Sequence, residues 1–299
     1  MPGLKDVKNK IKGIGKTAQI TKTMYMVASA KLRSAQKRME DFRPYTAKFT
    51  EVMRELSASE GETAAMPLME ERAVKTVELL VITSDRGLAG SFNSNILRAA
   101  DRLRKKYEAD GKKVSVVAVG KKASRYFRKL GLLRAQFNDI MGAFQMFNAR
   151  DIAQEVTTNF LSGGSDRVDI IYGKYYSMAV QKPEIEDMLP IKPVQAAEPT
   201  EAKPKEAAGK AVAGVYTFEP DSAAIMTDLL PLFLNVQVYH AMLEVGASEQ
   251  AARMTAMDNA TKACKDMIRD LTMLYNKARQ AAVTNELLDI VGGAEALKG

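Results

Sequence analysis

The sequence predicts a mixed α+β and α/β protein: its N- and C-terminal helices form a long antiparallel coiled coil, with an inserted Rossmann-like α/β domain. Two observations concern the ends of the 299-residue chain, where apolar residues recur in steps of three and four. That period is typical of helices that pack along a seam. A third concerns the middle, where runs rich in valine, isoleucine and tyrosine alternate with helical segments. Such alternation favours a parallel or mixed sheet.

Residues 1–58 are expected to form the N-terminal coiled-coil helix. The side chains that step by three and four along this segment are Leu4, Val7, Ile11, Ile14, Ala18, Thr21, Tyr25, Ala28, Leu32, Ala35, Met39 and Phe42. A seam of this length predicts a helix that buries one stripe against a partner helix and exposes the remaining faces.

The stretch "KGIGKT" (12–17) inside this segment ends like a phosphate-binding loop. The pattern G-x-x-x-x-G-K-[ST] would require a glycine at position 10, where the chain has Lys10. A phosphate loop also follows a buried strand, whereas the residues before this stretch are polar. Because Ile14 falls on the seam, we expect a helix here. Gly13 and Gly15 either weaken it by about 1 kcal/mol each or admit a close neighbour.

Residues 74–195 are expected to form the α/β domain. Strand-like runs occur at 76–84, 113–120 and 167–178, and helical segments lie near 93–107, 121–130 and 148–161. The stretch "QKPEIEDMLPIKP" predicts one further edge strand. Residues 196–212 are rich in Ala, Glu, Lys and Pro and have no apolar period, so they are interpreted as a loop or linker.

Residues 213–299 are expected to form the C-terminal coiled-coil helix. Pro231 is expected to open this helix in its first turn or to kink it, and Gly292-Gly293 to end it. Its seam consists of Met254, Met257, Thr261, Cys264, Ile268, Leu271, Tyr275, Ala278 and Ala282. Two amphipathic helices at opposite ends of one chain are expected to pair antiparallel.

The net charge of +8 lies entirely on the N-terminal segment. Residues 1–58 hold thirteen basic and five acidic residues, whereas the rest of the chain holds 31 of each. This asymmetry predicts an acidic partner, which could be nucleic acid, a membrane surface or an acidic protein surface. No apolar run is long enough to predict a transmembrane helix, and the single Cys264 excludes an internal disulfide.

No group of residues predicts an active site, a cofactor site or a metal site. The stretch "SDRGLAGS" (84–91) follows the first strand but is not G-x-G-x-x-G, so we expect a tight turn. His240 has no nucleophile motif beside it, and Cys264 falls on the seam. Three further carboxylates, expected on a solvated strand edge, are Glu184, Glu186 and Asp187. We therefore expect a non-catalytic protein without a cofactor.

Three stretches resemble the gamma subunits of bacterial F-type ATP synthases. They are "LKDVKNKIKGIGKTAQITKTMYMVASAKL", "ITSDRGLAGSFN" and "ASEQAARMTAMDNATKACKDMIRDLTMLYNKARQAAVTNELLDIVGGAEAL". The resemblance covers nearly the whole chain except 196–212. It implies a central rotor shaft that couples ion flow through a membrane c-ring to ATP synthesis or hydrolysis, without being catalytic itself.

The resemblance also implies partners, a location and functional residues. The partners are the alpha and beta subunits, which form a ring around the coiled coil, the epsilon subunit and the c-ring. The implied location is peripheral, on the cytoplasmic side of the cell inner membrane. Residues that match family positions for energy coupling or subunit contact are Met24, Arg253, Gln280, Thr284 and Glu286.

Two other classes of protein stay open from the residues alone. A nucleic-acid-binding coiled-coil protein would explain the basic segment and would bind with a steep salt dependence. However, the aromatic residues among its charges, Tyr25 and Phe42, lie on the seam. A small-molecule enzyme could use the α/β domain, but the sequence offers it no catalytic groups.

Overall fold

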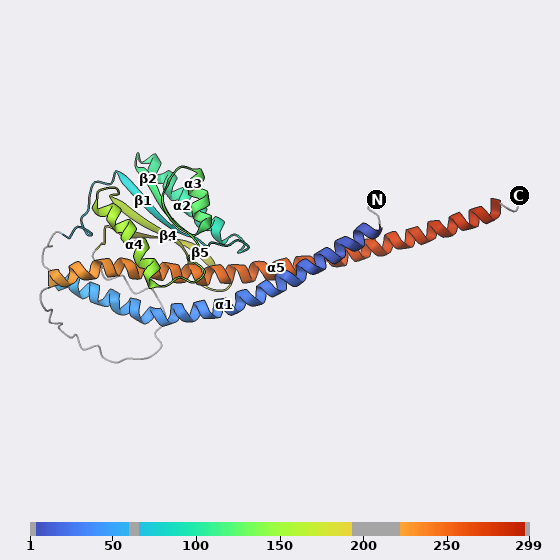
Figure 1. Ribbon diagram of the computed structural model, residues 1–299, viewed down its shortest axis with the longest axis horizontal. Coiled ribbons are helices and arrows are strands. Elements are labelled where there is room, and N and C mark those ends of the chain that lie inside the picture. The colour runs from blue at the N-terminus through green and yellow to red at the C-terminus, as the bar shows by residue number, and fades with distance from the viewer. Residues whose placement is uncertain (1–3, 60–65, 193–221, 297–299) are drawn as a thin grey trace. The chain divides into compact units, whose positions relative to one another are not determined.

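The computed structural model describes residues 4–59, 66–192 and 222–296, and the predicted linker 196–212 lies outside them. The chain divides into two compact units. The helix-pair unit comprises Met1–Lys31 and Arg253–Gly299, and the sheet unit comprises Leu32–Ala252. Helix α1 spans Leu4–Ser59 and helix α5 spans Ser222–Ala296, so each contributes to both units (Figure 1).

The sheet unit is built on five strands in the order β3-β2-β1-β4-β5. The strands are β1 (Thr76–Ile82), β2 (Lys113–Val119), β3 (Leu133–Phe137), β4 (Arg167–Tyr175) and β5 (Gln181–Leu189). All neighbours pair in parallel except β5, which is antiparallel to β4. The predicted mixed sheet and its edge strand are confirmed. Strand β3 was not predicted, because "LRAQF" is short and alternates with polar residues.

Helices cover both faces of this sheet, close to the predicted segments. They are α2 (Phe92–Ala109), α3 (Lys121–Lys129) and α4 (Met146–Leu161). A Cβ atom on Gly173 of β4 would lie 2.4 Å from Cε2 of Phe92, so α2 packs directly on that strand. Helix α4 covers the other face, where its Asn159 donates to Glu78 of β1. Glu78 is paired in register with Val168 of β4, and the side chain of Val168 points to the opposite face from Gly173.

The core of the sheet unit lies between the strands and helices on both faces. Residues Val77–Ile82 of β1 are fully buried, as expected for a central parallel strand. The same apolar cluster includes Met39 of α1 and Leu234 and Met242 of α5. These stretches of the long helices therefore belong to the core of the sheet unit.

The predicted end of the C-terminal helix is wrong, and so is one of the two alternatives for Pro231, that it opens the helix. Helix α5 begins at Ser222, so Pro231 lies inside it rather than at its first turn. The buried side chains of Leu230 and Leu234 on either side pack in the core, and this packing offsets the hydrogen bond that proline removes. The helix also continues through Gly292-Gly293 to Ala296, because glycine lowers helix stability without excluding helical φ and ψ.

The stretch "SDRGLAGS" forms a turn that joins the carboxyl ends of three strands. The carboxylate of Asp85, which follows β1, accepts backbone N–H groups from Lys121 (3.0 Å), Asp139 (2.9 Å) and Met141 (3.0 Å). Lys121 follows β2, and the other two follow β3. Next to this turn, Gly120 has a φ of 89°, and a Cβ atom there would lie 2.3 Å from the carbonyl oxygen of Thr83. The expected structural turn is confirmed.

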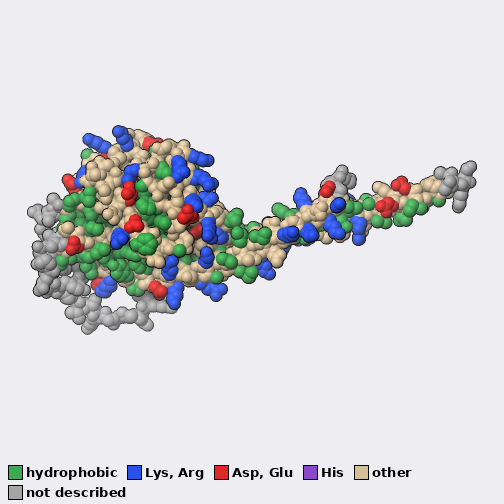
Figure 2. Space-filling view, viewed as in Figure 1, with side chains coloured by type: hydrophobic (Ala, Val, Ile, Leu, Met, Phe, Trp, Pro, Cys, Tyr) green, Lys and Arg blue, Asp and Glu red, His purple; other side chains and the backbone are tan. Residues whose placement is uncertain are grey.

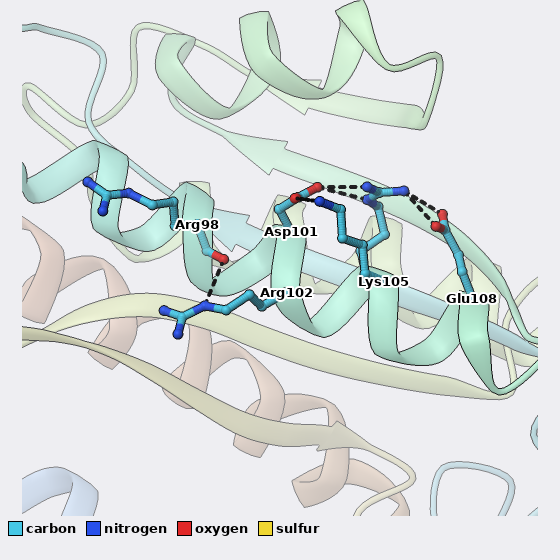
Figure 3. Close-up of polar contacts among 6 residues, drawn as sticks. Arg98, Asp101, Arg102, Lys105 and Glu108 are labelled. Atoms are coloured by element: carbon cyan, nitrogen blue, oxygen red, sulfur yellow. Dashed lines mark hydrogen bonds and ion pairs between the residues drawn. The ribbon is translucent and has the colours of Figure 1, made fainter.

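A network of ion pairs covers part of helix α2 (Figure 3). Asp101 pairs with Arg104 (2.8 Å) and Lys105 (3.0 Å), and Arg104 also pairs with Glu108 (2.6 Å). Burial acts to raise the pKa of the Asp101 carboxyl. The hydrogen bonds and charges of Arg104 and Lys105 outweigh it and hold this pKa below its usual value.

We expect Asp85→Ala to destabilise the sheet unit by about 2–3 kcal/mol, because three backbone N–H groups lose a charged acceptor and water replaces it only in part. Urea unfolding followed by the near-UV circular dichroism of the tyrosines measures this. The exposed Asp110, which follows α2, provides the control. Asp110→Ala should change the free energy of unfolding by no more than about 0.5 kcal/mol, and equal effects of the two variants would contradict the role given to Asp85.

Asp101→Asn tests the pH dependence of the α2 network. A carboxyl with a lower pKa in the folded than in the unfolded state contributes stability above the unfolded pKa of about 3.9, and this contribution is lost as pH falls. We expect the variant to be less stable than the wild type by up to about 1 kcal/mol at pH 7. The difference in unfolding free energy should shrink as the pH is lowered through that value. A difference that stays constant would contradict the prediction.

Candidate partner-binding surface of the paired helices

A continuous seam holds the helix-pair unit together. Every predicted seam residue of α1 from Leu4 to Ala28 is buried or half-buried, as is every one of α5 from Met254 to Ala282. Val7, Ala28 and Met257 are the most enclosed apolar side chains, at 4%, 1% and 5% exposed. Figure 1 shows the two segments side by side and running in opposite directions. The predicted antiparallel pairing is therefore confirmed within this unit.

A buried polar contact sets the register of the two helices. The hydroxyls of Thr21 and Thr261 lie 2.8 Å apart, and both residues are 9% exposed. Each hydroxyl also lies near a carbonyl oxygen of its own helix, Thr21 near Ala18 (3.1 Å) and Thr261 near Met257 (2.8 Å), so either threonine can be the donor between the helices. Sliding one helix along the other would place each hydroxyl against apolar neighbours, which costs free energy when a buried polar group loses its partner.

The stretch "KGIGKT" is helical, which confirms the seam interpretation over a phosphate loop. Ile11 and Ile14 are half-buried, and Lys12 and Lys16 are exposed. Thr17 donates to the carbonyl oxygen of Gly13 (3.2 Å), a bond within one helix. A Cβ atom on Gly13 or Gly15 would meet nothing within 4 Å, so the outer face of this turn is open.

A set of exposed lysines, the lysine stripe, lies off the seam on α1. Its members are Lys5, Lys8, Lys10, Lys12, Lys16, Lys22 and Lys31. The only acidic residue between positions 4 and 31 is Asp6. Within the described part of the chain, no ion pair joins a member of this stripe to a carboxylate. By contrast, Lys262 of α5 pairs with Asp258 (2.7 Å). The positive charge of α1 is thus free to meet an acidic partner.

Exposed apolar side chains interrupt the lysine stripe. Ile20, Met24 and Val27 are 60%, 36% and 52% exposed. Their spacing of four and three residues places them on one face of α1, away from the seam. Figure 2 shows hydrophobic and basic side chains next to one another along the paired helices. A surface that combines both suits a protein partner that offers acidic and apolar groups together.

The last turns of α5 carry a second apolar surface, the apolar tip. Its members are Val283, Leu287, Leu288, Ile290 and Val291, which are 49%, 58%, 63%, 68% and 57% exposed. Figure 1 shows α5 continuing past the first residues of α1, so these turns extend beyond the paired region. A contiguous apolar surface of this kind marks an interaction site.

The five residues implied by the resemblance all fall in the helix-pair unit, but not in one cluster. Met24 lies on the apolar face just described, and Arg253 is half-buried near the start of the α5 segment. Gln280, Thr284 and Glu286 are exposed. Thr284 donates to the carbonyl oxygen of Gln280 (2.9 Å), which places these two on one face of α5. Sequence reasoning missed Ile20 and Val27, although their spacing from Met24 was a usable signal.

The titratable groups considered as catalytic candidates make structural contacts. Nε2 of His240 lies 3.7 Å from Glu244, whose other oxygen accepts the backbone N–H of Tyr175 (2.7 Å). Glu186 accepts the hydroxyl of Tyr172 (2.6 Å), and burial, followed by the charge of Glu186, raises the pKa of that tyrosine far above its usual value.

The remaining candidates form ion pairs or lie on the seam. Glu184 pairs with Lys174 (3.3 Å), Asp187 pairs with Arg167 and Lys192, and Cys264 is half-buried on the seam. Among the residues that the structure describes, no three His, Cys, Asp or Glu side chains group as a metal site would require. None of the described helices combines the length and apolar character needed to cross a membrane.

Comparisons with known proteins give the same family along nearly the whole chain. The family model described as ATP synthase matches residues 3–297. The ATP synthase gamma chain of Desulfotalea psychrophila is 58% identical over 298 residues, and the alignment covers 100% of both chains.

Two solved structures of ATP synthases contain chains that are similar to this one. A chain of the central stalk and c-ring structure of the Tetrahymena thermophila mitochondrial ATP synthase is 27% identical, with a TM-score of 0.58 over 81% of this chain and 99% of that one. A chain of the Euglena gracilis mitochondrial ATP synthase (OSCP, F1 and c-ring) shares the fold. Its TM-score is 0.69 at 23% identity, and the match covers 98% of this chain and 94% of that one.

Thr21→Val tests whether the threonine pair stabilises the helix pair. Valine has nearly the same shape but leaves the Thr261 hydroxyl without its partner on the other helix, which we expect to cost about 1.4 kcal/mol and to speed local amide hydrogen exchange about tenfold. Mass spectrometry of peptides from both helix segments measures the exchange. The matched control is Thr23→Val, whose hydroxyl is exposed and bonds only within α1. Equal exchange in the two variants would contradict the proposed role of the pair.

Proposed function

The chain belongs to the ATP synthase gamma chain family, and on this premise we propose that it is the central rotor shaft of an F-type ATP synthase. As a shaft it couples ion flow through a membrane c-ring to ATP synthesis or hydrolysis at a ring of alpha and beta subunits. The observation that carries the proposal is the helix-pair unit, which leaves the lysine stripe and the apolar tip without partners among the described residues. The Tetrahymena relative is part of a structure of the central stalk and c-ring.

The helix-pair unit is the part that we place inside the alpha–beta ring. Acidic groups of the beta subunits would face the lysine stripe, because opposite charges orient an encounter and exclude wrong partners. The apolar tip would lie in an apolar sleeve formed by the ring. Of the five residues named from the resemblance, Met24 would contact beta beside Ile20 and Val27. Arg253, Gln280, Thr284 and Glu286 would support contacts with beta or between the helices.

The sheet unit is the part that we place at the foot of the shaft, against the epsilon subunit and the c-ring. The solved structure of the Tetrahymena relative contains the central stalk together with the c-ring, so a similar chain occurs in one assembly with such a ring. The chain would then be a peripheral member of the complex on the cytoplasmic side of the cell inner membrane. Through this position it would regulate both ATP hydrolysis and proton flow.

The physical reason for such a shaft lies in its asymmetry. A pair of helices with exposed lysines on α1, an apolar face on α1 and charges of both signs on α5 presents different contacts to each beta subunit around it. Chemically identical sites are thereby stabilised in different conformations, and rotation exchanges those conformations. The chain itself would take no part in the chemistry, in keeping with the structural contacts made by His240, Glu186 and Asp187.

Reconstitution tests this proposal. Isolated alpha and beta subunits are mixed with and without the chain, the stoichiometry of the assembly is measured, and sustained ATP hydrolysis is compared. We expect one copy per alpha–beta ring, higher turnover with the chain present and no hydrolysis by the chain alone. A chain that never joins the ring and instead binds DNA or turns over a small molecule would contradict the proposal.

A charge-reversal variant tests the lysine stripe in the same assay. We expect Lys12→Glu, Lys16→Glu and Lys22→Glu together to weaken binding to the alpha–beta ring about tenfold at low salt, with a smaller effect at high salt. The matched control makes the same change in charge on the sheet unit, through the exposed residues Lys106→Glu, Arg125→Glu and Lys129→Glu. Equal weakening in both variants would show that net charge, and not this stripe, governs assembly.

A further inference from the structure

The loop between β3 and α4, residues 138–145, ends in a buried aromatic side chain that contacts both long helices. Phe144 is 5% exposed. The guanidinium carbon of Arg38, on α1, lies 4.7 Å from the centre of its ring. On α5, a Cβ atom at Gly246 would lie 3.4 Å from the ring, and the ring of Tyr239 meets it edge-on at 5.8 Å. One side chain of the loop is thus enclosed by α1 and α5 together.

Arg38 fastens this arrangement with hydrogen bonds. Its Nη2 atom donates to the carbonyl oxygen of Phe144 (2.9 Å) and to the hydroxyl of Tyr239 (3.2 Å). The planar guanidinium therefore contacts the loop and α5 while its own backbone belongs to α1. Fixed donor geometry of this kind is what distinguishes arginine from lysine. The aromatic contact of Tyr239 with Phe42, at 4.9 Å, adds a second link between the two helices.

The other end of the loop is anchored to the sheet. Asp85, at the carboxyl end of β1, accepts the backbone N–H groups of Asp139 and Met141. Met141 is itself 5% exposed, and the N–H of Ala143 bonds to the carbonyl oxygen of Ile140. A short, internally bonded segment therefore connects the central strand of the sheet to Phe144.

We propose that Arg38 and Phe144 form a torque link, through which force applied to the sheet is passed to α1 and α5. This inference rests on the proposed function, since a rotor driven at its foot must transmit torque from that part to the helices in the ring. Force on the sheet reaches the loop through Asp85 and reaches both helices through Phe144. Arg38 is a positioning residue here, because it holds the helices and the loop in one arrangement and contacts no nucleotide.

We expect loss of this contact to reduce proton pumping when the complex works against a proton gradient, and to leave ATP hydrolysis unchanged when there is no gradient. Without a proton gradient the shaft turns against little resistance, and the remaining core contacts keep the parts together. Against a gradient the force across the link rises, and a weakened link lets the sheet slip relative to the helices. In other proteins, residues that lie between two sites alter the energetic coupling of those sites by about twofold or more. We expect an effect of the same order on pumping here.

The test uses the whole ATP synthase complex in sealed vesicles. ATP-driven proton pumping is followed with a pH-sensitive dye, and ATP hydrolysis is measured in the same vesicles with and without an uncoupler. For Arg38→Ala we expect hydrolysis with uncoupler to stay at the wild-type level. The protons pumped per ATP against an established gradient should fall about twofold or more. Arg38→Lys, which keeps the charge but loses the planar fork, should lie in between.

Two further variants keep the outcome decisive. Phe144→Leu retains an apolar side chain but removes the ring, so it should reproduce the loss of Arg38→Ala. Arg43→Ala makes the same substitution at an exposed position of α1 and should pump like the wild type. Unchanged pumping by both Arg38→Ala and Phe144→Leu overturns the inference. So does a parallel loss of pumping, hydrolysis and assembled chain, which would show a folding contact only. Failure of the wild-type chain to assemble or pump would instead count against the proposed function.

Discussion

The burial of one seam shared by the two ends of the chain is the interaction on which the helix-pair unit depends. Isolated helices of ordinary sequence are marginal in water, and tertiary packing supplies most of their stability. In this unit the seam supplies that packing, with Val7, Ala28 and Met257 as its most enclosed apolar members. The hydroxyl pair of Thr21 and Thr261 adds a register to what would otherwise be a nonspecific apolar contact.

Because the seam uses only one stripe of each helix, it leaves the other faces available to partners. Three exposed surfaces remain for this reason: the lysine stripe, the face of Ile20, Met24 and Val27, and the apolar tip. A protein that rotates inside a ring of partner subunits requires exposed contact surfaces of this kind. It does not require a pocket with convergent catalytic groups. In the sheet unit, by contrast, several carboxylates are paired within the unit, as the contacts of Asp85, Asp101 and Glu186 show.

The seam could be predicted residue by residue, since a period of three and four is a local property of the sequence. The same holds for the central strands and for α2 to α4, whose apolar runs are pronounced. Strand β3 was missed because its residues are only partly buried and alternate with Arg134 and Gln136. The interior position of Pro231 depends on packing around Leu230 and Leu234, which no local signal encodes. The contacts of Asp85 and Phe144 likewise join residues far apart in sequence. The roles of Met24, Arg253, Gln280, Thr284 and Glu286 came from resemblance and stay predictions.

Rotation of the chain inside the alpha–beta ring is the most direct measure of the central claim. A bead is attached to a cysteine introduced at the exposed Ala109 of α2, with Cys264→Ala to remove the native thiol, and the ring is fixed to a surface. On addition of ATP, the shaft account predicts stepwise rotation in one direction that stops when ATP is removed. Sustained ATP hydrolysis by the same assemblies while the bead stays still would contradict it.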